Sequence, residues 1–284
     1  MILVTFVTAC QTALEKEQPV PQPIDRNEHE NLPQENDERS DGEELLEEDL
    51  VLEVDLTPFT NRQPAQWAEN VSGVKTRLHT DDKVIALTFD ACGGPYGNGY
   101  DEELVTFLQA EQIPATLFFN ERWILEHEDL FLELASDPLF QIENHGTAHV
   151  PLSVTGHSAW GIKGTSSPEE VVDEVLGNQE TIKRLTGQAP TLFRSGTAFY
   201  DEVAVEIVNE LGLEVVNFDV LGDAGATFSA EQVHRALLDA KNGSIVLLHM
   251  NQPSSGTAAG VKKAVNDLRE MGFSFVLLED YELE

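Results

Sequence analysis

The stretch from Val84 to Gly94 constrains the possible folds of this chain most strongly. It reads Val-Ile-Ala-Leu-Thr-Phe-Asp-Ala-Cys-Gly-Gly, and its apolar run predicts a buried strand that ends at Asp90. The glycines and Pro95 that follow cannot prolong a strand, and they let the backbone turn sharply. Because α/β folds place functional residues at the carboxyl ends of buried strands, Asp90 is a candidate functional residue. The simpler alternative is that Asp90 only caps the next helix.

Strands and helices alternate along the rest of the chain. The apolar pattern predicts further strands at 115–119, 140–142, 192–193, 214–219, 244–249 and 273–278. Helices are expected between them, at 101–112, 123–135, 167–185, 201–211, 229–240 and 260–271. The region 151–167 shows no clear period and is expected to form an irregular loop. This alternation predicts an α/β domain with a parallel sheet of βα units.

Three further places bring titratable side chains to strand ends or to nearby loops. His145 and His149 are four residues apart, which puts both imidazoles on one face of a helical turn and lets them share a metal ion, zinc most readily. Arg194 follows a short apolar run, and His249 ends another. Simpler interpretations are a chance histidine pair, a structural ion pair and a core histidine. In a parallel sheet, all these residues could reach one end.

The order of these segments resembles the polysaccharide deacetylase family, carbohydrate esterase family 4, over roughly residues 80–280. The family motif Thr-Phe-Asp-Asp-Gly is similar to residues 88–92, and His-Ser/Thr-x-x-His is similar to 145–149, with glycine in the second place. The family's Arg-Pro is similar to Arg194-Ser195, and its Leu-x-His to 247–249. An Asp-rich family motif that ends in Trp is echoed only loosely, without the Trp, by 218–223.

This resemblance implies a distorted (β/α) barrel with fewer than eight strands. It also implies a hydrolase that removes N-acetyl, or O-acetyl, groups from a carbohydrate polymer. Because an amide carbonyl is a poor electrophile, this reaction needs a divalent metal, zinc being favoured, and His145 and His149 match two of its ligands. Asp90 matches the general base, His249 the general acid and Arg194 the residue that orients the base.

The same resemblance suggests which residues contact the substrate, an acetylated polysaccharide or peptidoglycan. Leu247 matches one wall of the pocket for the acetyl methyl group. Backbone N–H groups around Thr197 could help to bind the oxyanion of the reaction. Asp223, in the loosely echoed fourth motif, is a candidate substrate contact.

The main departure from the family pattern is Ala91, because the family has its third metal ligand, an Asp, at this place. We expect Asp90 to complete the metal site, directly or through water, with the glycine turn giving it the freedom to reach the ion. Asp101, Asp223 or water alone could instead complete it, or the domain could bind glycan without catalysis. Cys92 is interpreted as an inert thiol rather than a ligand or nucleophile, because no histidine adjoins it in a nucleophile motif.

The first 56 residues predict a targeting segment and a tether. Residues 1–10 form a short apolar run that ends in Val-Thr-Ala-Cys, which resembles a bacterial lipoprotein signal with Cys10 as the lipidated residue. Residues 11–56 are rich in Gln, Pro, Glu and Asp and predict a disordered acidic tether. Residues 57–284 would then form the catalytic domain of an exported protein, anchored at the cell envelope.

The acidity of the chain limits its partners. The formal net charge is −34 over 284 residues. Such a charge opposes binding to nucleic acid or to an anionic membrane surface. We therefore expect no nucleic-acid partner, and contact with a membrane only through a lipid anchor.

Overall fold

The computed structural model describes residues 54–284. The expectations for residues 1–10, including Cys10, and for most of the tether lie outside this range. Two side chains that the sequence assigns to the tether, Val54 and Leu56, pack against a buried apolar cluster of the domain. Within the described range, no helix combines the length and apolar character needed to cross a membrane.

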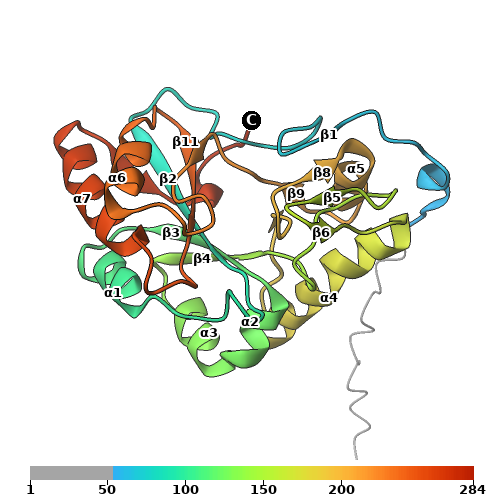
Figure 1. The fold of residues 1–284 in the computed structure, drawn as a ribbon, viewed down its shortest axis with the longest axis horizontal. Coiled ribbons are helices and arrows are strands. Elements are labelled where there is room, and N and C mark those ends of the chain that lie inside the picture. Colours follow the sequence, from blue (N-terminus) through green and yellow to red (C-terminus); the bar gives the residue numbers. More distant parts are fainter. Residues whose placement is uncertain (1–53) are drawn as a thin grey trace, which may run out of the picture. The chain divides into compact units, whose positions relative to one another are not determined.

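Seven parallel strands form the continuous row of the main sheet (Figure 1). In spatial order they are β10 (Val220–Leu221), β11 (Ser244–His249), β2 (Val84–Ala91), β3 (Ala115–Phe119), β4 (Phe140–Asn144), β7 (Leu192–Phe193) and β9 (Glu214–Val215). A further short strand, β12 (Ser274–Val276), pairs in parallel with the beginning of β2, off this row. The curled row confirms the predicted α/β fold, a distorted (β/α) barrel with fewer than eight strands.

Seven α-helices connect these strands. They are α1 (Glu102–Ala110), α2 (Glu121–Glu126), α3 (Glu128–Ala135), α4 (Pro168–Thr186), α5 (Glu202–Glu210), α6 (Ala230–Leu238) and α7 (Thr257–Glu270), with short 3-10 helices at Thr57–Phe59 and Leu278–Asp280. The single helix predicted at 123–135 is instead the pair α2 and α3. The break falls at His127, which has φ −134° and donates from its ring to the Asn98 carbonyl at 2.9 Å.

Two small antiparallel pairs lie outside the main sheet. Strand β1 (Trp67–Ala68) pairs with β8 (Tyr200–Asp201), and β5 (Ser158–Ala159) pairs with β6 (Ile162–Lys163). The second pair is a hairpin inside the region 151–167, which the sequence predicts to be irregular. Its turn, Trp160-Gly161, has positive φ at both residues, 52° and 80°, as a type I′ hairpin turn requires.

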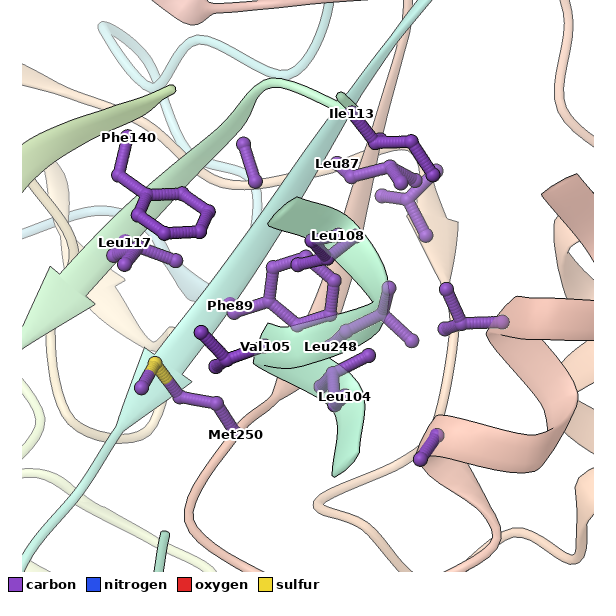
Figure 2. Packing of buried hydrophobic residues seen from close by; sticks show 14 of the residues in the cluster. Leu87, Phe89, Leu104, Val105, Leu108, Ile113, Leu117, Phe140, Leu248 and Met250 are labelled. Atoms are coloured by element: carbon purple, nitrogen blue, oxygen red, sulfur yellow. The ribbon is translucent and has the colours of Figure 1, made fainter. Parts of the chain in front are cut away.

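The side chains of β2 alternate between two buried environments. Leu87, Phe89 and Ala91 belong to the core cluster between the sheet and the helices, and Figure 2 shows Leu87 and Phe89 packed near side chains of α1. Thr88 and Asp90 point to the opposite side, because successive residues of a strand face opposite ways. The alternation sends Asp90 away from the helices and leaves Ala91 among apolar side chains.

A short segment before β2 lies between the two ends of the strand row. On one side, the backbone carbonyl of Lys75 accepts from the Asn217 N–H at 2.7 Å. On the other side, the backbone N–H of Leu78 donates to the Gly243 carbonyl at 2.8 Å. The last residue, Glu284, accepts from the Thr76 N–H at 2.7 Å. The first and last segments of the domain therefore meet at this seam, and Figure 1 shows the C-terminus beside the N-terminal part of the described chain.

Candidate active site

The carboxyl ends of β2 and β11 open into a cleft of about 740 Å³. Asp90 and Cys92 line it from the end of β2, and Leu247 and His249 line it from β11. Thr197 lines it from the loop that follows β7. The structure thus brings most of the predicted site residues to one cleft, as the parallel strand order requires.

Asp90 is held by a buried guanidinium group. Arg194 has no exposed surface, and its Nη1 donates at 2.9 Å both to Asp90 Oδ1 and to the Thr88 hydroxyl. Its Nε and Nη2 donate to two backbone carbonyls at 3.1 and 3.0 Å, and its guanidinium carbon lies 4.2 Å from the centre of the Phe118 ring. One carboxylate oxygen of Asp90 is therefore fixed, while Oδ2 lies 3.5 Å from His145 Nε2.

His145 lies at the carboxyl end of β4 and is buried. Its Nδ1–H donates to the backbone carbonyl of Arg194 at 2.9 Å, and because a carbonyl can only accept, the proton is placed on Nδ1. The lone pair of Nε2 is then free. It faces Asp90 Oδ2 at 3.5 Å and Cys92 Sγ at 3.8 Å.

The segment from His145 to His149 is not a helical turn, so this part of the prediction is wrong. Gly146 and His149 have positive φ values of 79° and 62°, which a helix does not allow. The bend instead brings the two imidazoles edge to face, with ring centres 4.9 Å apart. His149 Nε2 is buried and has no hydrogen-bond partner within the described part of the chain.

Glu174 of α4 holds this bent segment in place. Its carboxylate accepts from the N–H groups of Ala148, His149 and Val150 at 2.8, 3.0 and 3.3 Å. Burial raises its pKa to about 6, although these three hydrogen bonds act in the opposite direction. A Cβ at Gly146 would lie 2.4 Å from Glu174 Oε1, which explains why glycine replaces the usual Ser or Thr.

The role of Glu174 could not be predicted from the sequence. Within the helical pattern of α4 it looks like any other acidic side chain. The one available signal was the glycine at position 146, whose missing side chain leaves room for a carboxylate. Gly196 acts similarly from the other side, because a Cβ there would lie 2.5 Å from the Cα of His149.

Cys92 does not lie apart from the histidines, as an inert thiol would. Burial opposes a charged thiolate, but the nearby His149 and hydrogen bonding with His145 and His249 outweigh it, so the pKa of the Cys92 thiol falls well below its usual value. The sequence concealed this environment because its three histidine neighbours follow 53 or more positions later. Cys92 therefore joins the site.

His249 is oriented by a buried carboxylate. Asp223 Oδ1 accepts from His249 Nδ1–H at 2.8 Å, and its Oδ2 accepts from the backbone N–H of His249 at 2.8 Å and from the Thr257 hydroxyl at 2.9 Å. Burial lowers the pKa of His249, but the charge and hydrogen bond of Asp223 outweigh burial and raise it well above its usual value. Asp223 thus lies behind His249 rather than on the cleft wall, where the sequence places it as a substrate contact.

The remaining candidate residues fall into two groups. Leu247 and Thr197 lie on the cleft wall, and the hydroxyl of Thr197 is buried without a hydrogen-bond partner in residues 54–284. Asp101, a candidate substitute ligand, instead caps α1 by accepting from the Leu104 N–H at 3.0 Å. Neither Asp101 nor Asp223 therefore stands in the place of a third metal ligand.

The residues present fit a divalent metal ion. Donor atoms of Cys92, His145 and His149 all lie within 4.8 Å of one another. His149 Nε2 is buried and has no hydrogen-bond partner in the described part, as expected of a nitrogen that binds a metal ion. The expectation that Asp90 completes the metal site stays a prediction. Arg194 binds its Oδ1, so only Oδ2 could reach an ion.

The chain is similar in sequence to a family of known proteins and to a relative from Bacillus subtilis. Residues 77–216 match the family model described as polysaccharide deacetylase. The uncharacterized protein YlxY of Bacillus subtilis (strain 168) is 24% identical over 183 residues, which cover 63% of this chain and 52% of that protein. The match thus spans about half the length of that relative.

Two solved structures share the fold. A mutant, with restored enzymatic activity, of a carbohydrate esterase family 4 pseudoenzyme from Bacillus anthracis is 22% identical, with a TM-score of 0.62 over 75% of this chain and 72% of that one. A family 4 acetyl xylan esterase from Clostridium thermocellum, in complex with a cobalt ion, is 21% identical, with a TM-score of 0.57 over 70% of this chain and 89% of that one. At these identities the likeness concerns the fold.

Proposed function

We propose, from the match of residues 77–216 to the polysaccharide deacetylase family model, that the chain is a metal-dependent hydrolase that removes acetyl groups from a carbohydrate polymer. One observation carries the proposal. The Asp90–Arg194 pair, the two imidazoles of His145 and His149, and the His249–Asp223 pair converge at the end of one sheet. A domain that only binds glycan has no need of both a held base and a held acid.

The proposed roles follow from the contacts of these residues. A divalent metal bound by His145 and His149 would polarise the acetyl carbonyl and activate a water molecule. Asp90 takes the proton of that water on Oδ2, while Arg194 holds Oδ1 at 2.9 Å and keeps the carboxylate aimed at the cleft. His249 gives a proton to the leaving amine or hydroxyl group. Its raised pKa keeps it protonated at neutral pH, as a general acid must be.

The wall of the cleft favours a neutral glycan as the substrate. Among the described lining residues, Arg122 is the one arginine and there is no lysine, and the Arg122 guanidinium already donates to the Cys92 carbonyl at 3.0 Å and to Asn120 at 3.0 Å. Trp160, at the tip of the β5–β6 hairpin, lines the cleft with 73% of its surface exposed. An exposed indole gives a sugar ring an apolar face to pack on. A polyanionic polymer would meet repulsion from the net charge of −34.

A catalytically silent glycan-binding domain is the second candidate function. Ala91 stands where the family has a metal-binding Asp, and one of the similar structures derives from a pseudoenzyme. In that case the cleft and Trp160 would bind acetylated glycan, and the Asp90–Arg194 pair would serve stability alone.

Acetate release separates the two candidates. We expect the purified, zinc-loaded protein to release acetate from acetylated xylan or from N-acetylglucosamine oligomers, and a chelator to stop the release until zinc is restored. Asp90→Asn and His249→Asn should abolish it, because each removes a proton-transfer group. The exposed residues Asp82 and His79 offer matched controls, and Asp82→Asn and His79→Asn should keep full activity. Glycan binding without any acetate from the wild type would instead support the silent domain.

We propose further that the protein acts at the cell envelope. The support is the sequence Val-Thr-Ala-Cys at the end of residues 1–10, outside the described residues. A radiolabelled fatty acid should be incorporated into the wild-type protein expressed in bacteria but not into Cys10→Ala. Equal labelling of the two proteins would contradict lipidation of Cys10.

A further inference from the structure

We infer that Cys92 supplies the third protein ligand of the metal through its Sγ, so that the site is Cys-His-His. This inference rests on the metal site of the proposed function and adds the identity of one ligand. It also gives the chain a donor in place of the carboxylate that Ala91 lacks.

The side chain of Cys92 lies on the cleft side of the sheet. Ala91 is fully buried in the core cluster between the sheet and the helices, so a side chain at this position faces away from the cleft. Cys92 follows Asp90 by two residues, and residues two apart at a strand end lie on the same face. Asp90 and Cys92 accordingly both line the cleft. In this chain, position 92 and not position 91 presents a donor to the histidines.

The distances between the donor atoms suit a zinc ion. Zinc binds thiolate sulfur at about 2.3 Å and imidazole nitrogen at about 2.0–2.1 Å, which for tetrahedral angles puts the two ligand atoms about 3.6 Å apart. Cys92 Sγ lies 3.8 Å from His145 Nε2. With a His149 nitrogen included, all the donor atoms lie within 4.8 Å of one another. The three donors need only a small contraction around an ion.

Two of the three donors, His145 and Cys92, are held in place by the protein itself. His145 donates its Nδ1–H to the Arg194 carbonyl at 2.9 Å, which leaves the Nε2 lone pair facing Cys92 and is the arrangement that metal-bound histidines adopt. The Cys92 carbonyl accepts from Arg122 Nη2 at 3.0 Å. The turn at Gly93, directly after Cys92, packs so closely that a Cβ there would lie 2.6 Å from the backbone nitrogen of Trp123. This close packing restricts the backbone next to Cys92.

This assignment also separates two roles that would otherwise compete for Asp90. Arg194 binds Asp90 Oδ1, and Oδ2 remains available to take a proton. With a thiolate as the third ligand, Asp90 need not bind the metal. A soft sulfur donor also favours zinc over hard ions such as magnesium or calcium.

Cobalt substitution tests the inference with a readout other than activity. The chain has two cysteines, so in a Cys10→Ala background Cys92 is the remaining one. We expect this protein to bind one Co²⁺ and to show a thiolate-to-cobalt charge-transfer band in the near ultraviolet. Cys10→Ala/Cys92→Ser should lose the band and bind zinc at least about tenfold more weakly, because the loss of a ligand costs at least as much as the loss of an outer partner. Cys10→Ala/Cys92→Asp should keep zinc but show no band.

The outcomes distinguish this inference from the proposed function. Cobalt bound to the Cys10→Ala protein without a charge-transfer band would overturn the role of Cys92 and leave the histidine metal site standing. Failure of the folded protein to bind any metal would overturn both. Circular dichroism of each variant checks that a lost band does not reflect unfolding. A band that survives in the Cys92→Ser variant would also contradict the inference.

Discussion

Arg194→Met is expected to lower the free energy of unfolding by about 3–5 kcal/mol, because it leaves the carboxylate of Asp90 buried without its partner. The arginine side chain is fully buried and Asp90 is 4% exposed, so bulk water compensates little for the lost ion pair. The substitution also frees two backbone carbonyls that the guanidinium satisfies at 3.1 and 3.0 Å. Urea denaturation at pH 7, followed by tryptophan fluorescence, measures the change.

A surface ion pair provides the matched control. Arg62 pairs with Glu206, but their side chains are 37% and 49% exposed. Arg62→Met should therefore cost no more than about 1 kcal/mol, in line with exposed pairs in general. If Arg194→Met and Arg62→Met lose similar amounts of stability, the Asp90–Arg194 pair is not the buried anchor described here.

Ala91→Asp is expected to destabilise the domain by more than about 3 kcal/mol and to add nothing to metal binding. The substitution would restore the residue type of the family motif. In this structure, however, position 91 is fully buried among apolar side chains, including Phe119 and Trp123. An ionised carboxylate placed there has no partner and must be desolvated. Thermal unfolding and zinc titration together measure both effects.

The same substitution at an exposed alanine tests whether the effect comes from the site. Ala259 lies in the first turn of α7 and is exposed, and a carboxylate near a helix N-terminus is tolerated or favourable. Ala259→Asp should change stability by less than about 0.5 kcal/mol. A stable Ala91→Asp variant that binds zinc more tightly than the wild type would show that position 91 faces the metal, which would also weaken the case for Cys92.

Much of the fold could be predicted because its signals are local. The apolar runs that end at Asp90 and His249 mark β2 and β11, and the alternation of strands and helices gives the parallel sheet. The errors arise where a distant contact decides the local structure. The strand predicted at 214–219 ends as β9 at Val215, because the following backbone turns to pair with Lys75.

In the candidate site, too, residues with local sequence signals could be predicted, and residues placed by distant contacts could not. Asp90 and His249 were found because each ends an apolar run, and strand ends of a parallel sheet converge, whereas His145 was found by its spacing from His149. Cys92 and Glu174 were missed because nothing near them in the sequence marks their neighbours. The helical spacing of His145 and His149 suggested a helix, whereas a carboxylate 25 residues away from His149 imposes the bend.

The seam between the ends of the strand row has a consequence for biosynthesis. Residues 75–78 are made before any other part of the seam, yet their partners lie at 215–217, 243–244 and 283–284. Pairing over such long stretches of sequence is slow to form. The seam also cannot close until residues 283–284 have been synthesised, because their backbone groups pair with residues 76–78. We therefore expect this domain to complete its folding late in its synthesis, and the incomplete domain to be prone to aggregation until then.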